Sequence, residues 1–166
     1  QALRPEVIAA DGGSHGMTTE RMADLVEQLA ARMKDHPEQA EGWVMLGRSY
    51  AALGRYEDSV KAFREASTRI KDDAKLLADY ADVLAMTQGR QLAGEPEKLL
   101  AQALRIDPGN GKALALMGTL EFDRKNYDKA AQTWEKLLEL APPDSPFAAS
   151  VRSSIAEARQ LAKGER

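Results

Sequence analysis

Cysteine is absent from this 166-residue sequence, and histidine occurs only twice, as His15 and His36. The lack of cysteine excludes disulfide bonds, thiol catalysis and the cysteine ligands of zinc fingers and iron–sulfur clusters. Two histidines, one in a glycine-rich stretch and one beside Pro37, leave little for a transition-metal site. The sequence therefore predicts neither a metal site nor a bound cofactor.

The sequence also lacks an excess of positive charge and any long apolar run. Lys and Arg number 23 against 26 Asp and Glu, so the formal net charge is −3. Because a nucleic-acid-binding protein needs a basic surface, we expect no nucleic-acid partner. No run of 18 apolar residues occurs, so no transmembrane helix is expected within these bounds.

Aromatic residues are scarce at 5%, whereas alanine and leucine number 28 and 19. Ala and Leu favour helices, while strands favour aromatic and β-branched residues. The composition therefore predicts an all-α fold. A chain of this length is enough for one domain with a sizeable core.

The N-terminal segment differs from the rest in its glycine content. Residues 1–16 contain Pro5, Gly12-Gly13 and Gly16, which oppose regular structure, so we expect a flexible tail there. A single domain is expected over residues 17–166. Its first helix should start near Thr18 or Thr19, either of which can cap a helix, and should end before Pro37.

A short motif in residues 43–50 is the most informative part of the sequence. Trp43, Leu46, Gly47 and Tyr50 lie at i, i+3, i+4 and i+7, so they share one helical face. Glycine inside a helix costs up to about 1 kcal/mol relative to alanine, and the close approach of a second helix would explain it. A turn at Gly54 and a second apolar helix follow. This order is the tetratricopeptide (TPR) pattern, a helix–turn–helix unit.

The pattern recurs along the chain. Turns between repeats fall at Pro37, Lys71, Pro108 and Pro142, which are 34, 37 and 34 residues apart. The three additional residues belong in the loop at 87–94. The sequence thus predicts an all-α TPR superhelix with three helix-turn-helix repeats, over about 40–73, 74–110 and 111–144.

Two flanking helices are expected to cover the ends of this array, because a stack of hairpins leaves its terminal apolar faces bare. One is the first helix, and the other is a capping helix over 146–163. The apolar stripe expected to face the array in the capping helix consists of Phe147, Val151, Ile155, Ala158 and Leu161 or Ala162.

Three residues depart from the TPR pattern. Ser59 replaces alanine where paired helices touch, Lys71 replaces the turn proline, and Glu121 replaces the tyrosine of the first helix in repeat three. None of these changes is large enough to break the repeat unit.

A stack of such hairpins has a concave groove lined mainly by the first helix of each repeat. Such grooves accept extended peptides or amphipathic helices. The residues that face away from the partner helix are mostly small or apolar, which suits the nonpolar face of a helix. They are Val44, Arg48 and Ala52 in repeat one, Ala78, Asp82 and Met86 in repeat two, and Ala115, Thr119 and Phe122 in repeat three. For Met86 and Phe122, packing between hairpins is an equal alternative.

Nothing in the sequence indicates catalysis. Both histidines precede the repeats, so no Ser/His/Asp order with plausible spacing exists. The glycines at 12 and 13 lack the Gly-Lys that opens the helix after a phosphate-binding loop. We therefore expect a protein that binds other proteins and is not an enzyme.

A closer likeness rests on residues spread over all three repeats. They are Glu41-Gly42-Trp43, residues 46–50, 53–56 and 79–82, Leu104 to Pro108 with Ala113-Leu114, and Tyr127 with Trp134-Glu135. With these residues and the expanded loop near 89–94, residues 18–163 resemble the periplasmic TPR domain of the CcmI (CycH) apocytochrome c chaperones. The related NrfG assembly factors for nitrite reductase are similar too.

The resemblance implies a function and a location. Members of this family bind the C-terminal helix of newly translocated apocytochrome c and deliver it to the haem-ligation complex, without holding haem in this domain. The resemblance also implies a periplasmic domain tethered to the inner membrane by segments upstream of this chain. The alternative is a generic TPR scaffold that docks folded partners in a cell-envelope or cytosolic assembly.

Overall fold

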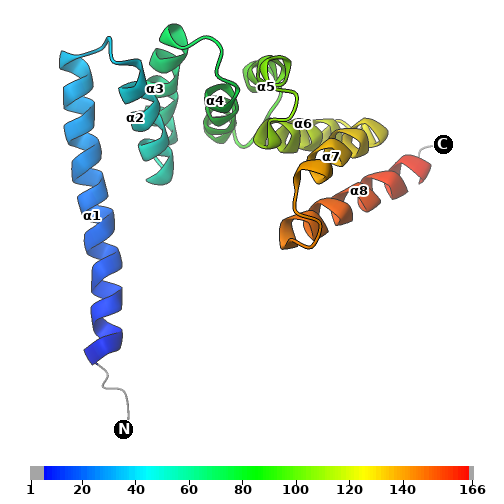
Figure 1. Cartoon of the computed structure of the whole chain (residues 1–166), viewed down its shortest axis with the longest axis horizontal. Helices are drawn as coiled ribbons and strands as arrows, with labels where there is room; N and C mark the ends of the chain where they lie inside the picture. Colours follow the sequence, from blue (N-terminus) through cyan, green and yellow to red (C-terminus); the bar gives the residue numbers. More distant parts are fainter. Residues whose placement is uncertain (1–5, 165–166) are drawn as a thin grey trace. The chain divides into compact units, whose positions relative to one another are not determined.

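The computed structural model describes the backbone of residues 6–164 and the side chains of residues 18–164. Within this part of the chain all regular structure is helical, as the composition predicts (Figure 1). The helices are α1 (Glu6–Asp35), α2 (Ala40–Ala52), α3 (Tyr56–Arg69), α4 (Ala74–Thr87), α5 (Glu95–Ile106), α6 (Gly111–Asp123), α7 (Tyr127–Leu140) and α8 (Pro146–Gly164).

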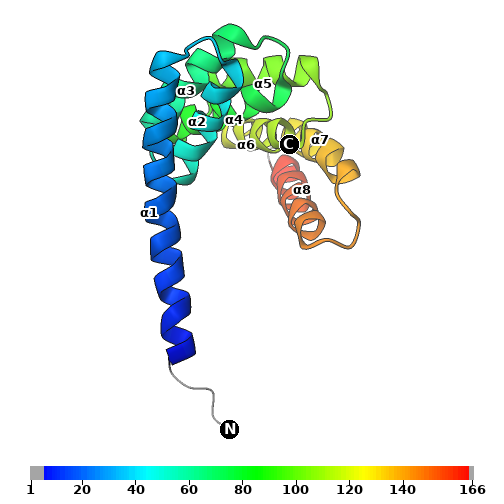
Figure 2. The same cartoon turned by 60° about the vertical axis from the view of Figure 1, so that its left-hand side comes forward.

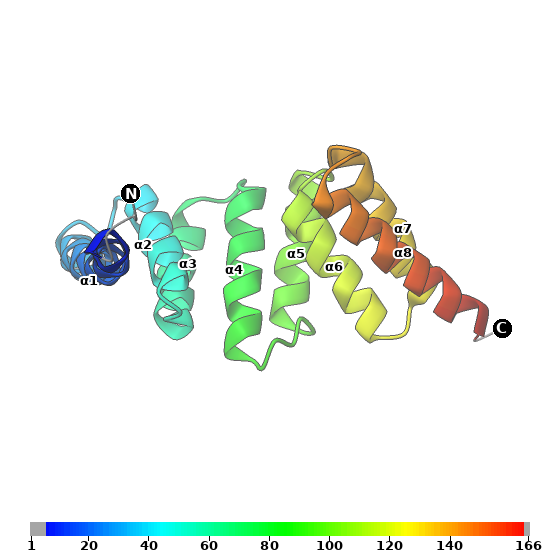
Figure 3. The ribbon, with the colours of Figure 1, turned by 90° about the horizontal axis from the view of Figure 1, so that it is seen from below.

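The chain forms two compact units, residues 1–69 and residues 70–166. In the first, α2 and α3 form a hairpin and α1 packs on α2. In the second, α4 pairs with α5 and α6 with α7, while α8 packs on α7 (Figure 3). The three predicted repeats are thus three helical hairpins, with α1 before them and α8 after them. The expected single domain over 17–166 stays a prediction.

Helix α1 begins much earlier than the sequence predicted. It starts at Glu6, so residues 6–16 are helical where we expected a tail, and the start near Thr18 or Thr19 is wrong (Figure 2). Glycine inside a helix costs about 1 kcal/mol but does not forbid it, whereas an interior proline does. In the sequence, Pro5 comes before Glu6, the first residue of α1, so the described helix has no interior proline. Residues 1–5 of the predicted tail lie outside the described residues.

The first hairpin is held closely by a glycine and a serine. A Cβ atom at Gly47 would lie 3.0 Å from three ring atoms of Phe63, a side chain that is fully buried. The buried hydroxyl of Ser59 donates a hydrogen bond to the Gly47 carbonyl oxygen at 2.6 Å. Ser59 therefore adds a bond between α2 and α3 at the place where the pattern has alanine.

The third hairpin repeats this close approach with a larger aromatic residue. A Cβ atom at Gly118 would overlap the indole ring of Trp134, so only glycine leaves room for that ring. Nearby, the buried carboxylate of Glu121 accepts a hydrogen bond from the Thr133 hydroxyl at 2.7 Å. Glu121, the departure from the expected tyrosine, thus joins α6 to α7 through a polar contact.

Helix α8 buries a slightly different stripe from the one predicted. Ala148, Val151, Ala158 and Ala162 are buried, whereas Phe147 and Leu161 are 52% and 38% exposed. The buried positions follow the helical spacing through Ala148, and Phe147 lies one residue, or about 100°, away from that line. The side chain of Phe147 is therefore left on the surface.

Candidate functional site

A hollow of about 420 Å³ lies between α1 and α2 in the unit of residues 1–69. It brings together Val44, Arg48 and Ala52, the three groove residues predicted for repeat one. Val44 is buried, while Arg48 and Ala52 are exposed. The other lining residues are Met22 on α1 and Glu41, Met45 and Ser49 on α2. We refer to this set as the α1–α2 hollow.

Two exposed methionines contribute apolar surface to this hollow. Met45 is 60% exposed and Met22 is 40% exposed, so both apolar side chains face solvent. Methionine is flexible and polarizable, which lets it adapt to varied apolar partners. Charged lining is limited to Arg48 and Glu41. The surface suits an apolar ligand face with little charge.

Sequence reasoning missed both methionines. Neither Met22 on α1 nor Met45 on α2 was among the predicted groove residues. Met45 lies three residues before Arg48 and four before Ser49, so it shares their helical face. The projection of α2 could therefore have included it.

The predicted groove residues of repeat two do not form an open lining. Ala78 is 1% exposed and belongs to the core of the unit of residues 70–166. The Lys112 ammonium group on α6 lies 2.9 Å from a carboxylate oxygen of Asp82 and 3.0 Å from one of Asp79. Met86 is half-buried. The acidic charge predicted for the groove is thus balanced by a lysine.

Burial and the two carboxylates act on Lys112 in opposite directions. Partial burial lowers the pKa of Lys112, but its hydrogen bonds to Asp82 and Asp79 raise it more, so the net shift is upward. The lysine therefore stays charged and ties α6 to α4.

The predicted residues of repeat three have three different surroundings. The Thr119 hydroxyl is exposed and donates to the Ala115 carbonyl oxygen at 3.0 Å. The half-buried ring of Phe122 packs within its own hairpin, with ring centroids 5.1 Å from Tyr127 and 5.8 Å from Trp134. Both partners lie on α7, whereas the packing alternative for Phe122 was between hairpins, so these contacts do not decide between the two interpretations.

Ala115 lines a second apolar hollow of about 420 Å³, between α6, α7 and the start of α8. Its most exposed apolar side chains are Leu140 at 54% and Phe147 at 52%. We did not predict either of them as a surface residue for binding. Phe147 was assigned to the buried stripe of α8, and only the register of that stripe could have corrected the assignment.

The described residues contain no group of three or more His, Asp or Glu residues that could hold a metal ion. Burial raises the pKa of the Glu121 carboxyl, although the Thr133 hydrogen bond opposes the shift. None of the described helices is both long enough and apolar enough to cross a membrane.

Most of this chain matches the model of a known protein family. Residues 3–148 match the model of the cytochrome c-type biogenesis protein H TPR domain. The chain belongs to this family of cytochrome c-type biogenesis TPR domains. The resemblance predicted from the sequence is therefore confirmed.

Curated relatives of this cytochrome c-type biogenesis TPR domain are mostly longer proteins. The CycH protein of Pseudomonas aeruginosa is 27% identical over 139 residues, which are 84% of this chain and 34% of that protein. The CcmH protein of Escherichia coli is 28% identical over 155 residues, 92% of this chain and 43% of that protein. NrfG, a formate-dependent nitrite reductase complex subunit of Escherichia coli, is 26% identical over 144 residues. The aligned residues are 86% of this chain and 73% of NrfG.

Solved structures support the fold of the TPR domain. The crystal structure of MamA superposes with a TM-score of 0.67 at 14% identity, and the match covers 92% of this chain and 95% of MamA. At this identity the likeness shows the fold alone. Together with the eight helices of the described residues, it confirms the all-α TPR fold.

Proposed function

We propose that this domain holds the C-terminal helix of apocytochrome c while haem is attached during cytochrome c maturation. Membership of the cytochrome c-type biogenesis family supports a role in cytochrome c maturation. The α1–α2 hollow supports the mode of binding, because its exposed Met22 and Met45 offer an apolar surface to one face of an amphipathic helix. That hollow is the observation that carries the proposal.

Binding of this kind depends on apolar contact rather than on charge. Met45 and Met22 would cover the nonpolar face of the helix, and Val44 would form the floor. Arg48 can meet a carboxylate or a helix C-terminus, where a cation is favourable. A standard interface buries about 800 Å² per partner, so the bound helix would also contact residues outside this hollow.

Calorimetry with a synthetic peptide of the host's cytochrome c C-terminal helix tests the proposal. We expect binding to the wild-type protein, and at least about tenfold weaker binding to Met45→Glu, because a carboxylate would face the apolar side of the helix. Leu161→Glu is the matched control, since Leu161 is also exposed but lies on α8. A folded protein that shows no binding at about 100 µM peptide contradicts the proposal.

Of the other predicted groove residues, Ala115 belongs to the proposal as part of a separate surface. Ala115 and the exposed Leu140 and Phe147 form the hollow of the unit of residues 70–166. Leu140→Glu tests this surface alone with the same peptide. If only this variant weakens binding, the helix binds there and the α1–α2 hollow has another role. Capture of envelope assembly proteins unrelated to cytochromes would instead favour the scaffold function.

We propose further that the domain works in the periplasm beside the haem-ligation complex, tethered to the inner membrane by other segments of a longer protein. Family membership supports this location. Protease treatment of spheroplasts tests it, because a periplasmic domain is digested when the outer membrane is opened. Protection of the domain until the inner membrane is broken would contradict it.

A further inference from the structure

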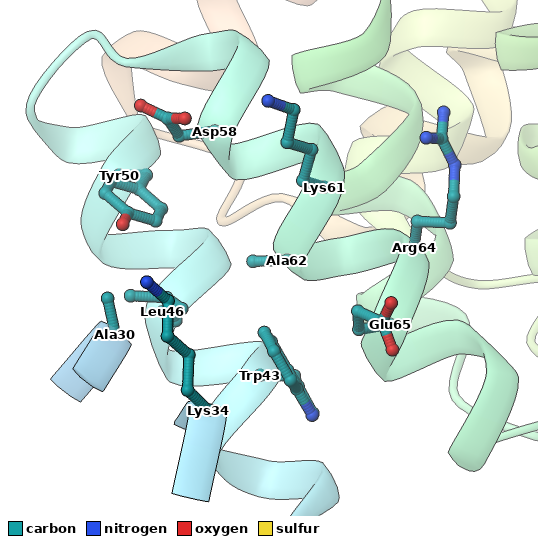
Figure 4. Close-up of a pocket in the computed structure, with 10 residues that line it drawn as sticks. All are labelled: Ala30, Lys34, Trp43, Leu46, Tyr50, Asp58, Lys61, Ala62, Arg64 and Glu65. Atoms are coloured by element: carbon teal, nitrogen blue, oxygen red, sulfur yellow. The ribbon is translucent and has the colours of Figure 1, made fainter. Parts of the chain in front are cut away.

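A third hollow lies in the unit of residues 1–69, on the opposite face of α2 from the α1–α2 hollow. It has a volume of about 400 Å³ and is lined by α1, α2 and α3 (Figure 4). Its apolar wall consists of Ala30, Trp43, Leu46, Tyr50 and Ala62. Trp43, Leu46 and Tyr50 are the residues of the TPR motif, so the repeat pattern itself builds this wall.

Within the described part of the chain, some charged residues around the hollow form ion pairs, and others do not. Its two carboxylates are both held by arginines that lie outside the lining. Asp58 lies 3.0 Å from the Arg55 guanidinium, and Glu65 lies 2.8 Å from that of Arg69. The same two guanidinium groups lie over aromatic rings of the wall, Arg55 at 4.6 Å from Tyr50 and Arg69 at 5.7 Å from Trp43.

Three cationic side chains remain. Lys34 comes from α1, and Lys61 and Arg64 come from α3. Within residues 18–164 the charged groups of these three side chains form no ion pair. The rim of the hollow is therefore positive, although the whole chain has a net charge of −3.

We propose that this hollow binds an acidic segment of a partner protein, in which an apolar side chain is flanked by carboxylates. The apolar side chain would fill the hollow against Trp43 and Leu46. The flanking carboxylates would pair with Lys34 and Lys61 from opposite sides, and Arg64 could hold a carboxylate through two hydrogen bonds. A purely apolar helix face would leave these cations unmatched, so the ligand differs from that of the α1–α2 hollow.

A defined probe tests the site: the end-blocked peptide Asp-Glu-Leu-Leu-Glu-Asp, with Asn-Gln-Leu-Leu-Gln-Asn as its neutral counterpart. NMR titration of the full chain should shift the indole N–H of Trp43 and leave that of Trp134 in place. Because the attraction is electrostatic, binding should weaken at least about fivefold between 0.05 and 0.5 M NaCl. The neutral peptide should bind at least about tenfold more weakly.

Charge reversal on two different helices separates the hollow from the general charge of the protein. Lys61→Glu on α3 and Lys34→Glu on α1 should each weaken binding of the acidic peptide at least about fivefold. Lys98→Glu, at an exposed lysine on α5, is the matched control and should change it less than twofold. Circular dichroism should show unchanged helix content in all three variants.

Three outcomes would overturn the proposal. One is equal weakening by Lys98→Glu, which indicates diffuse attraction. Another is a peptide-induced shift at Met22 and Met45 instead of Trp43, which places the acidic ligand in the α1–α2 hollow. The last is dimerisation that Lys61→Glu abolishes, which makes a second copy the occupant. None of these outcomes affects the calorimetric test with Met45→Glu, so the two proposals can fail separately.

Discussion

Gly118 and the indole of Trp134 share a space in which a single additional methyl group has no room. The same relation holds between Gly47 and the buried ring of Phe63. In each hairpin the glycine lies on the first helix and the aromatic side chain on the second. Close helix packing therefore outweighs the lower helix propensity of glycine at these two positions.

Gly118→Ala should destabilise the protein by about 1–3 kcal/mol, because the new methyl group must displace the Trp134 ring. Gly111→Ala on the same helix is the matched control. A Cβ atom there would meet Leu137 at 3.6 Å, an ordinary contact, and Gly111 is the first residue of α6, so the change in stability should stay within about 0.5 kcal/mol. Urea unfolding followed by circular dichroism measures both. Equal stability of the two variants would refute this account of Gly118.

Glu121 makes stability depend on pH in a direction unusual for a glutamate. Burial raises its pKa in the folded protein, so folding favours the protonated carboxyl. Its stabilising contribution is complete below the ordinary value of 4.5 and is lost as the pH rises through the raised value. Glutamine keeps an oxygen that can accept the Thr133 hydrogen bond and carries no charge.

Glu121→Gln should therefore be more stable than the wild type at pH 7, and the difference should shrink as the pH falls through the raised pKa of Glu121 and be smallest below 4.5. Urea unfolding at several pH values measures this difference. Glu139→Gln, at an exposed residue on α7, should show no such pH-dependent gain. A Glu121→Gln variant that loses stability at pH 7 would mean that the carboxylate stabilises the hairpin through its charge.

Helices α4 and α6 are joined at their surface by Lys112 and its two aspartates. Without the lysine, the carboxyl groups of Asp79 and Asp82, three residues apart on α4, would lose its ammonium group as a partner. Lys112→Ala should cost about 0.5–1 kcal/mol of stability at low salt, since the pairs are partly exposed and screened. The loss should nearly vanish in 1 M NaCl.

Urea unfolding at 0.05 and 1 M NaCl measures the effect of Lys112→Ala. Lys98→Ala, at an exposed lysine on α5, is the control and should change stability little at either salt concentration. A loss for Lys112→Ala that does not depend on salt would attribute the role of Lys112 to packing of its aliphatic stem.

At the level of whole helices the sequence was informative wherever the TPR pattern applied. Apolar spacing and turn residues predicted the three hairpins, because Gly54 and the prolines at 108 and 142 mark places where a helix cannot continue. The start of α1 was not predictable in this way. Glycine lowers helix propensity without forbidding a helix, so Gly12 and Gly13 could not settle whether residues 6–16 are helical.

The candidate site was less predictable than the fold. Projection of α2 found Val44, Arg48 and Ala52, since helical geometry decides which side chains share a face. Projection of α4 could not show that Ala78 is buried, because burial depends on how neighbouring helices pack. Phe147 was misplaced for the same reason: a shift of one residue in the α8 stripe exchanged it for Ala148.

The net charge of the whole molecule does not show how charge is distributed over its surface. A net charge of −3 argues against a nucleic-acid partner, yet Lys34, Lys61 and Arg64 gather at one hollow. The carboxylates that could neutralise them are already bound by Arg55 and Arg69. The charge at this hollow therefore depends on how ion pairs are distributed, which composition cannot reveal.

The division into two compact units has a consequence for folding. The unit of residues 70–166 has its own core, in which Leu77, Ala78 and Ala81 of α4 pack with Leu100 and Ala103 of α5. A second cluster joins Leu114, Leu137 and Val151 of α6, α7 and α8. Because all members of both clusters lie within this unit, the fragment of residues 70–166 should fold by itself.

The isolated fragment 70–166 should show a helical circular dichroism spectrum and a single cooperative unfolding transition in urea. A fragment of residues 88–166 is the matched control. It lacks α4 and with it a whole wall of the core, so it should lose cooperative unfolding because its remaining apolar faces are uncovered. If fragment 70–166 instead unfolds gradually, its core depends on residues 1–69, and the two units fold only together.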